Sequence, residues 1–174
     1  MKLTNNIDLR ELVPKSIWVK HGPRSVRFLN ARLIQATQWL INRFQLESVY
    51  FNTWLYGGDK EQRGLRIPGQ KYYRGDGLHD GGNALDFVPV RPGMSLHDLL
   101  VEIHLDAAQN PELYFEQGIW RIESLQLATT WIHLDAMYWP DQHEVVFIDL
   151  TNRFTASEYL QQLISQGYEL PNSP

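Results

Sequence analysis

The chain has 174 residues, a length that suits one domain and allows a hydrophobic core without disulfides. Apolar residues make up 43% and charged residues 21%, as in ordinary globular proteins, which argues against disorder. The chain has sixteen basic and twenty acidic residues, which gives a net charge of −4, and it has no basic tract. We therefore expect no nucleic-acid partner.

The sequence contains no cysteine. This excludes disulfides, thiolate nucleophiles and metal centres held by cysteine. Residues 1–19 lack the apolar core of a secretory signal, and no apolar run approaches the length of a membrane span. We therefore expect synthesis in a cytoplasm and no membrane partner.

Residues 1–22 form a polar N-terminal segment, and the predicted domain spans residues 23–170. From Pro23 to Phe44, apolar residues recur at three- and four-residue spacing, which predicts one helix. Strands are then predicted at 48–54 and 83–90. Between them, residues 57–82 hold eight of the twelve glycines, which indicates a long loop. Long ordered loops in compact domains are usually functional.

Two helices in the second half have recognisable N-terminal caps. Ser95, with Asp98 three residues later, predicts a helix over 95–109. Thr155, with Glu158 three residues later, starts a last helix in the same way.

Between these helices, three strands are predicted at 118–124, 129–138 and 144–148. The first two are joined by a short turn and form a hairpin. The fold class is therefore α+β, a single domain with an antiparallel sheet in its C-terminal half flanked by helices.

Without cysteine, a transition-metal centre must use His, Asp and Glu. His79 and Asp86 are seven residues apart with glycines between them, so the backbone can turn both side chains toward one point. His133, on a predicted strand, can complete the set. Two imidazoles and one carboxylate leave the fourth tetrahedral position to water, which is typical of catalytic zinc. The alternatives are a solvated turn around His79 and a hydrogen-bonded strand histidine at His133.

Two segments also follow a known family pattern. The pattern Ser-x-His-x-x-Gly-x-Ala-x-Asp is matched, with glycine in place of serine, by Gly77, His79, Gly82, Ala84 and Asp86. The later strand pattern Trp-x-His-x-Asp is matched by Trp131, His133 and Asp135. The sequence thus resembles the zinc D-alanyl-D-alanine peptidase and hedgehog superfamily over roughly residues 25–150. Upstream, residues 51–66 are similar to the strand and arginine loop of many phage-encoded members.

The resemblance implies a hedgehog/D,D-peptidase-like fold and an amide hydrolase with one Zn²⁺ held by His79, Asp86 and His133. The usual substrates of the superfamily are peptidoglycan cross-peptides. By the same resemblance, Arg66 or Arg63 would hold a substrate carboxylate through its planar guanidinium.

The position of the general base departs from two branches of the family. One branch places Glu three residues before the second histidine, where this chain has Thr130, and another places His where it has Trp131. A third puts Glu at the end of the preceding strand, and Glu123 fits that form. The alternative is an exposed strand carboxylate at Glu123, paired with Arg121 or another neighbour. A one-residue change of strand register decides which face Glu123 occupies.

Asp135 follows His133 by two residues, hence on the same face of the strand. It either orients an imidazole or serves as an alternative base, and the orienting role is favoured. His97 and His104, seven residues apart, predict a polar or partly buried face on their helix.

Three functional interpretations from different classes follow from this. The first is a zinc-dependent peptidase acting on peptidoglycan or a similar peptide, in which Glu123 takes a proton from the attacking water and Arg66 stabilises charge. The second is a structural module without turnover, such as a component of phage virions or their assembly. A third is a binding protein in which the ligand pattern is accidental. The final location is open between the cell wall, after release, and a virion.

Overall fold

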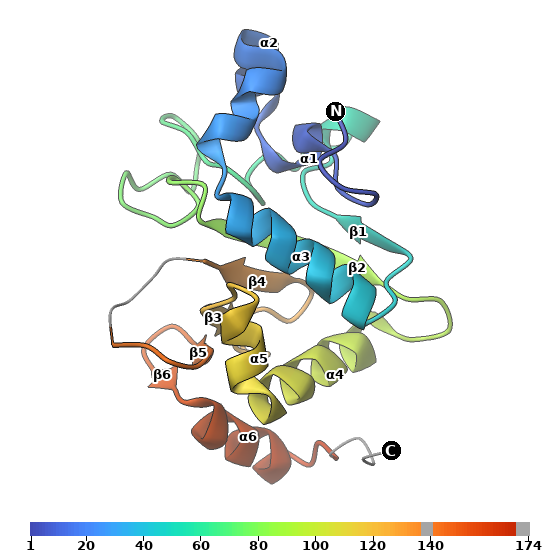
Figure 1. Cartoon of the computed structure of the whole chain (residues 1–174), viewed down its shortest axis with the longest axis vertical. Helices are drawn as coiled ribbons and strands as arrows, with labels where there is room; N and C mark the ends of the chain where they lie inside the picture. The colour runs from blue at the N-terminus through green and yellow to red at the C-terminus, as the bar shows by residue number, and fades with distance from the viewer. Residues whose placement is uncertain (137–140, 170–174) are drawn as a thin grey trace.

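The computed structural model describes residues 1–136 and 141–169, in which helices pack against one open sheet (Figure 1). The six strands in this part of the chain run in the order β1-β2-β4-β3-β5-β6. They are β1 (Ser48–Tyr50), β2 (Ala84–Val90), β3 (Arg121–Glu123), β4 (Ile132–Asp135), β5 (Val146–Ile148) and β6 (Arg153–Phe154). The predicted single α+β domain is confirmed.

The α-helices are α1 (Leu9–Leu12), α2 (Lys15–His21), α3 (Ala31–Arg43), α4 (Leu96–Gln109), α5 (Pro111–Glu116) and α6 (Ala156–Ser165). Short 3₁₀ segments are η1 (Gly22–Phe28) and η2 (Trp54–Tyr56). Both predicted caps are confirmed, because Ser95 accepts from the amide of Asp98 and Thr155 forms a capping box with Glu158. Within the described residues, none of the helices has the length and apolar character that crossing a bilayer requires.

The prediction of a single helix from Pro23 to Phe44 is wrong, because this segment forms two helical elements, η1 and α3. Asn30 adopts an extended conformation, and its side chain accepts a hydrogen bond from the amide of Arg32, so Asn30 begins a new helix, α3. The preceding turn is the 3₁₀ segment η1, in which Val26 is 38% exposed. The three- and four-residue spacing of apolar residues continues across Asn30 because η1 and α3 both contribute residues to packing.

The antiparallel sheet predicted for the C-terminal half is only partly right. β1 and β2 belong to the same sheet, and β3 pairs with β5 in parallel. The other neighbours are antiparallel, including β3 with β4, as the predicted hairpin requires. The predicted strand 129–138 is observed as β4, while residues 137 and 138 lie outside the described residues. Helix α5 was not predicted, although Pro111 at its first position is favourable there.

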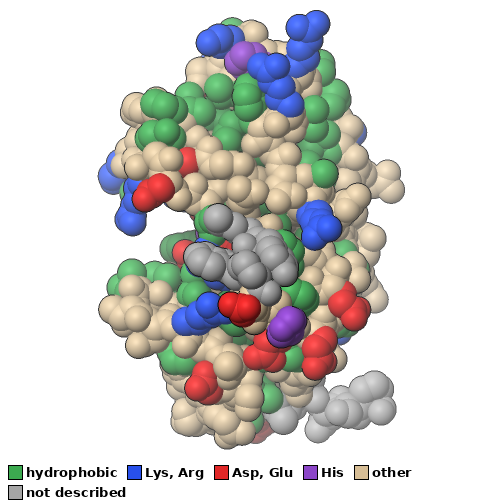
Figure 2. All heavy atoms as spheres, turned by 60° about the vertical axis from the view of Figure 1, so that its left-hand side comes forward, with side chains coloured by type: hydrophobic (Ala, Val, Ile, Leu, Met, Phe, Trp, Pro, Cys, Tyr) green, Lys and Arg blue, Asp and Glu red, His purple; other side chains and the backbone are tan. Residues whose placement is uncertain are grey.

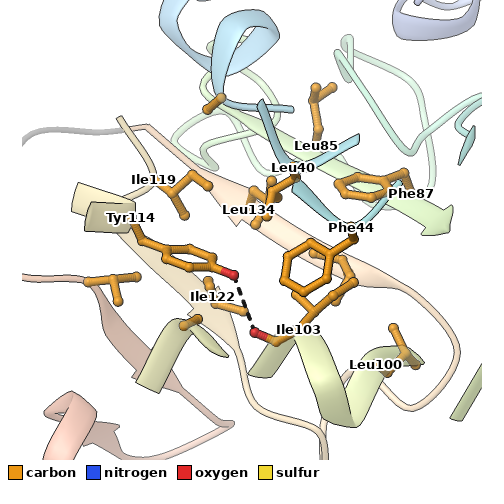
Figure 3. Packing of buried hydrophobic residues seen from close by; sticks show 14 of the residues in the cluster. Leu40, Phe44, Leu85, Phe87, Leu100, Ile103, Tyr114, Ile119, Ile122 and Leu134 are labelled. Carbon is orange, nitrogen blue, oxygen red and sulfur yellow. Dashed lines mark hydrogen bonds between the residues drawn. The ribbon is translucent and has the colours of Figure 1, made fainter. Parts of the chain in front are cut away.

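One face of the sheet forms the main hydrophobic core. Its buried side chains include Leu85, Phe87, Ile122, Ile132 and Leu134. Helices α3, α4 and α5 cover this face, with Leu40, Ile103 and Tyr114 among the side chains that meet it (Figure 3). Because successive side chains of a strand point to opposite faces, the residues between these apolar positions point away from the core.

Residues 1–22 also contribute to packing. Ile7, Leu9, Leu12 and Val13 are completely buried. Leu9 and Val13 form a second, smaller cluster with Leu65, from the loop between η2 and β2. The N-terminal segment therefore supports the long loop that carries His79.

Candidate metal centre

Three neighbouring strands place polar side chains at one level of the sheet. Asp86 of β2 lies directly opposite His133 of β4. On the other side of β4, Ile122 lies opposite Leu134, so the next position along β3, Glu123, falls beside His133. All three side chains point to the face that the helices leave uncovered. The register left open by the sequence thus places Glu123 on the same face as His133.

His79 reaches this face from the loop between η2 and β2, and the loop is held at two points. The amide of Leu65 donates to the carbonyl of Leu12 at 2.9 Å, and the amide of Asn30 donates to the carbonyl of Gly82 at 3.0 Å. The backbone of the loop lies very close to the other segment at both points. A Cβ on Gly64 would lie 2.1 Å from the Leu12 oxygen.

The ring of His79 is oriented by the backbone of the same loop. Its Nδ1 lies 2.9 Å from the carbonyl oxygen of Gly64, to which it donates a proton. This bond fixes the tautomer, so Nε2 presents its lone pair to Asp86 and His133. The side chain of His79 is almost completely buried.

The three candidate ligand atoms converge. The Nε2 of His79 lies 3.3 Å from Oδ1 of Asp86 and 3.4 Å from Nδ1 of His133. The Nδ1 of His133 lies 2.7 Å from the same Asp86 oxygen. Tetrahedral zinc with bonds of about 2.0–2.2 Å places its ligand atoms about 3.3 Å apart. The donor set and two of its three separations therefore fit a zinc ion.

The electrostatics of this group favour a cation. Burial opposes ionisation of Asp86, yet hydrogen bonds with His133 and His79 prevail and hold the pKa of its carboxyl below the usual value. Burial likewise opposes a charge on His133, but its hydrogen bond to Asp86 prevails and raises the pKa of the imidazole. The carboxylate thus attracts positive charge to the point where the three ligand atoms meet.

The guanidinium of Arg66 pairs with Asp86, one of the candidate ligands. Its Nη2 is 3.2 Å from Oδ2 of Asp86, and its Nε donates to the carbonyl of Gln62. The guanidinium therefore orients the carboxylate through the oxygen that does not face the histidines. Arg63 makes one side-chain bond, to the carbonyl of Phe51, and has no ion pair among the described residues.

Glu123 lies beside the candidate ligands, and Arg121, its other expected partner, pairs with Asp135 instead. Its Oε1 is 3.9 Å from Nδ1 of His133, and its side chain is 22% exposed. Arg121 does not pair with Glu123 among the described residues; its Nε bonds Asp135 at 2.6 Å. The carboxylate of Asp135 is buried 3.9 Å from Nε2 of His133, too far for a hydrogen bond. Asp135 thus lies behind the ring, held by Arg121.

These side chains lie at a cleft of about 950 Å³, and Figure 2 shows the molecule hollowed on the corresponding side. This volume is within the range of small-molecule sites. The residues lining it include His79, Asp86, His133, Glu123, Arg63, Arg66, Tyr72 and Trp131.

Sequence reasoning missed one residue that contacts the site from behind. His104 is completely buried, with its Nε2 2.9 Å from the carbonyl oxygen of Glu123 and its Nδ1 2.7 Å from that of Leu100. Of the two histidines expected on one helix face, only His97 is exposed. Nothing in the spacing could identify the Glu123 carbonyl, nineteen residues away, as the partner.

The fold and the site together define an α+β domain in which two histidines and one aspartate converge at a cleft. No family model, curated protein or solved structure matches the chain.

Proposed function

We propose that the protein is a zinc-dependent peptidase, similar to the D,D-peptidase and hedgehog superfamily, that hydrolyses amide bonds in peptidoglycan cross-peptides or similar peptides. The observation that carries this proposal is the convergence of His79, Asp86 and His133 beside a carboxylate at a cleft. The family pattern in the sequence supports the same ligands.

A zinc ion at this point would polarise the scissile carbonyl and acidify water. Glu123, partly exposed and next to the ligands, is positioned to accept the proton of the attacking water and deliver it to the leaving amine. Arg66 keeps Asp86 in its ligand orientation. Arg63 also lines the cleft and is better placed than Arg66 to bind a substrate carboxylate, because its guanidinium is not engaged by Asp86.

One observation favours a second candidate, a structural module without turnover. Arg66, expected to stabilise substrate charge, is engaged by Asp86, and the two histidines already hydrogen-bond within the group. Such a set can hold the loop to the sheet without any reaction. A component of a virion or its assembly would need no more than this.

Metal content is the first test. We expect about one zinc per chain by plasma mass spectrometry in the wild type. His79→Ala should lose it, whereas His97→Ala, which changes an exposed histidine, should retain it. Zinc-free wild-type protein after incubation with excess metal would contradict the proposal.

Hydrolysis is the second test, on purified sacculi and cross-linked peptides. Glu123→Gln should abolish cleavage while zinc stays bound, and Glu112→Gln, on an exposed face of α5, should leave cleavage unchanged. Turnover that survives in Glu123→Gln would remove Glu123 from the mechanism. A zinc-loaded wild type that cleaves nothing would favour the structural module.

A further inference from the structure

Positive charge is segregated in one segment of the chain. Residues 12–46 contain six Lys and Arg and no Asp or Glu. The rest of the chain holds ten basic and twenty acidic residues, a net charge of −10. The overall charge of −4 therefore conceals a basic region on an acidic protein, and such regions attract anionic partners.

Four of these cations lie on α2 and η1, residues 15–28, which we call the basic arm. Its cations are Lys15, Lys20, Arg24 and Arg27, all exposed, and none forms an ion pair with any residue in 1–136 or 141–169. His21 lies among them: partial burial, and then Arg27 and Lys20, lower the pKa of its imidazole. The cations are thus close enough to act on a common neighbour.

The basic arm is at one end of the molecule's long axis. α2 forms that end in Figure 1, and Figure 2 shows cationic side chains and a histidine gathered there among hydrophobic ones. On the face in view, the acidic side chains lie nearer the middle and the opposite end. A negatively charged surface would repel most of the protein and attract this end.

Aliphatic side chains are exposed among the cations. Val19 is 76% exposed and Val26 38% exposed, whereas α2 buries none of its residues completely. The aromatic rings are different, because Trp18 and Phe28 pack against the small cluster of Leu9 and Val13. Bases of single-stranded nucleic acid stack on exposed aromatic faces, whereas this packing partly buries both rings. Cations around exposed aliphatic groups instead suit an anionic bilayer surface.

We propose that the basic arm docks the protein peripherally on an anionic phospholipid bilayer. Lys15, Lys20, Arg24 and Arg27 lie at the level of the headgroups, and Val19 and Val26 reach the edge of the hydrocarbon. The contact needs no spanning segment, so it departs from the expectation of no membrane partner, which rested on the length of apolar runs. It does not depend on the metal centre or on catalysis.

Docking would also orient the cleft. The basic arm lies between the two backbone contacts that hold the loop of His79, one at Leu12 and one at Asn30. Because Ile17, Trp18 and Phe28 pack on the same cluster as Leu65, the basic arm and this loop are joined by packing as well. A bilayer at the end formed by α2 therefore fixes the direction in which the cleft faces.

The test is cosedimentation of the whole protein with vesicles. We expect binding to phosphatidylcholine vesicles that contain phosphatidylserine, little binding to phosphatidylcholine alone, and weakening by salt. Lys20→Glu should lower the bound fraction severalfold, and Val19→Asp should lower it as well. Lys71→Glu, the same change on an exposed loop lysine, should leave binding unchanged.

Three results would overturn the proposal. They are equal binding to both kinds of vesicle, equal losses in Lys20→Glu and Lys71→Glu, and no vesicle binding by wild-type protein that is retained on polyphosphate or DNA. The last would identify a soluble polyanion as the partner. Thermal unfolding of each variant separates a damaged fold from a lost contact.

Discussion

The two faces of the central sheet are built from the same three strands but are stabilised in different ways. On the helix-covered face, Leu85, Ile122 and Leu134 are buried among other apolar side chains. On the opposite face, one residue along each strand, Asp86, Glu123 and His133 lie side by side. Packing alone accounts for the first face. The second holds two carboxylates and an imidazole, whose burial is favourable only when their charges are matched.

The two faces should therefore contribute differently, the apolar face to the stability of the fold and the polar face to binding. Apolar burial contributes roughly 1.5–3 kcal/mol for each large side chain and is indifferent to metal and pH. If a metal binds between the candidate ligands, the stability of the polar face should depend on that metal and on pH. Changes on the two faces should therefore differ most clearly when zinc and pH are varied.

The largest effect is expected from neighbouring residues of β4 with opposite orientations. Leu134→Ala should lower the free energy of unfolding by about 2–5 kcal/mol, because it leaves a cavity in the core. It should still be stabilised by zinc, by about 4 kcal/mol at a concentration a thousand times the dissociation constant. His133→Ala should lose that zinc-dependent stabilisation. Urea unfolding with zinc and with a chelator measures both.

The comparison fails if the two variants behave alike. Equal zinc stabilisation in His133→Ala would show that His133 is not a ligand. Loss of zinc binding in Leu134→Ala would show that the site cannot be separated from the core behind it.

Gly82 tests how the loop of His79 is held to the end of η1. Its φ is +68°, and a Cβ there would lie 1.9 Å from the Phe28 carbonyl oxygen. Gly82→Ala should cost about 1–3 kcal/mol from backbone strain, and should weaken zinc binding because the clash displaces the loop of His79. Gly69→Ala is the control, because φ is +90° but no atom lies within 4 Å. Calorimetric titration with zinc should separate the two; equal affinities would show that the clash does not reach His79.

His104 tests the contact behind the candidate base. His104→Leu removes the hydrogen-bond donor that serves the carbonyl of Glu123 or Leu100, at a cost of about 1–3 kcal/mol. Zinc content should be unchanged, since His104 lies on the other side of the sheet from the ligands. The measurement is urea unfolding combined with metal analysis. Zinc loss without loss of stability would contradict a purely supporting role.

Local features were predicted correctly from the sequence where they depend on the chemistry of a few neighbouring residues. The caps at Ser95 and Thr155 are confirmed because a side-chain oxygen can satisfy the free amides of a helix start. The long glycine-rich loop is observed too. The pattern around His79 and Asp86 led to the residues that the structure brings together with His133. The zinc ion and its chemistry stay predictions.

What the sequence could not predict depends on contacts between distant segments. The parallel pairing of β3 with β5 joins segments far apart in the sequence, such as Arg121 and Val146, and no local spacing records it. The partner of Arg66 is Asp86, a candidate ligand twenty residues away, and that of Arg121 is Asp135 rather than Glu123. Which of several possible partners a charged side chain pairs with depends on their distances, and these are fixed only when the sheet has formed.

The smallest expected effect, and the sharpest contrast between the faces, comes from two buried histidines, one on each face. Burial lowers the pKa of His104 below 6.5, only partly offset by its two carbonyl partners. Unfolding therefore takes up a proton below pH 6.5, and stability falls as the pH is lowered. The pKa of His133 is raised above 6.5, since Asp86 outweighs its burial. Its contribution is complete below pH 6.5 and is lost as the pH rises through the raised value.

With a chelator present, the free energy of unfolding attributable to these two groups should thus be greatest near pH 6.5. His104→Leu should remove the decline on the acidic side, and His133→Ala the decline on the alkaline side. Zinc needs a neutral imidazole, so its stabilisation should grow with pH and reverse only the alkaline decline. Urea midpoints across this range measure all three. An alkaline decline that persists in His133→Ala would assign it to another group and remove the coupling to Asp86.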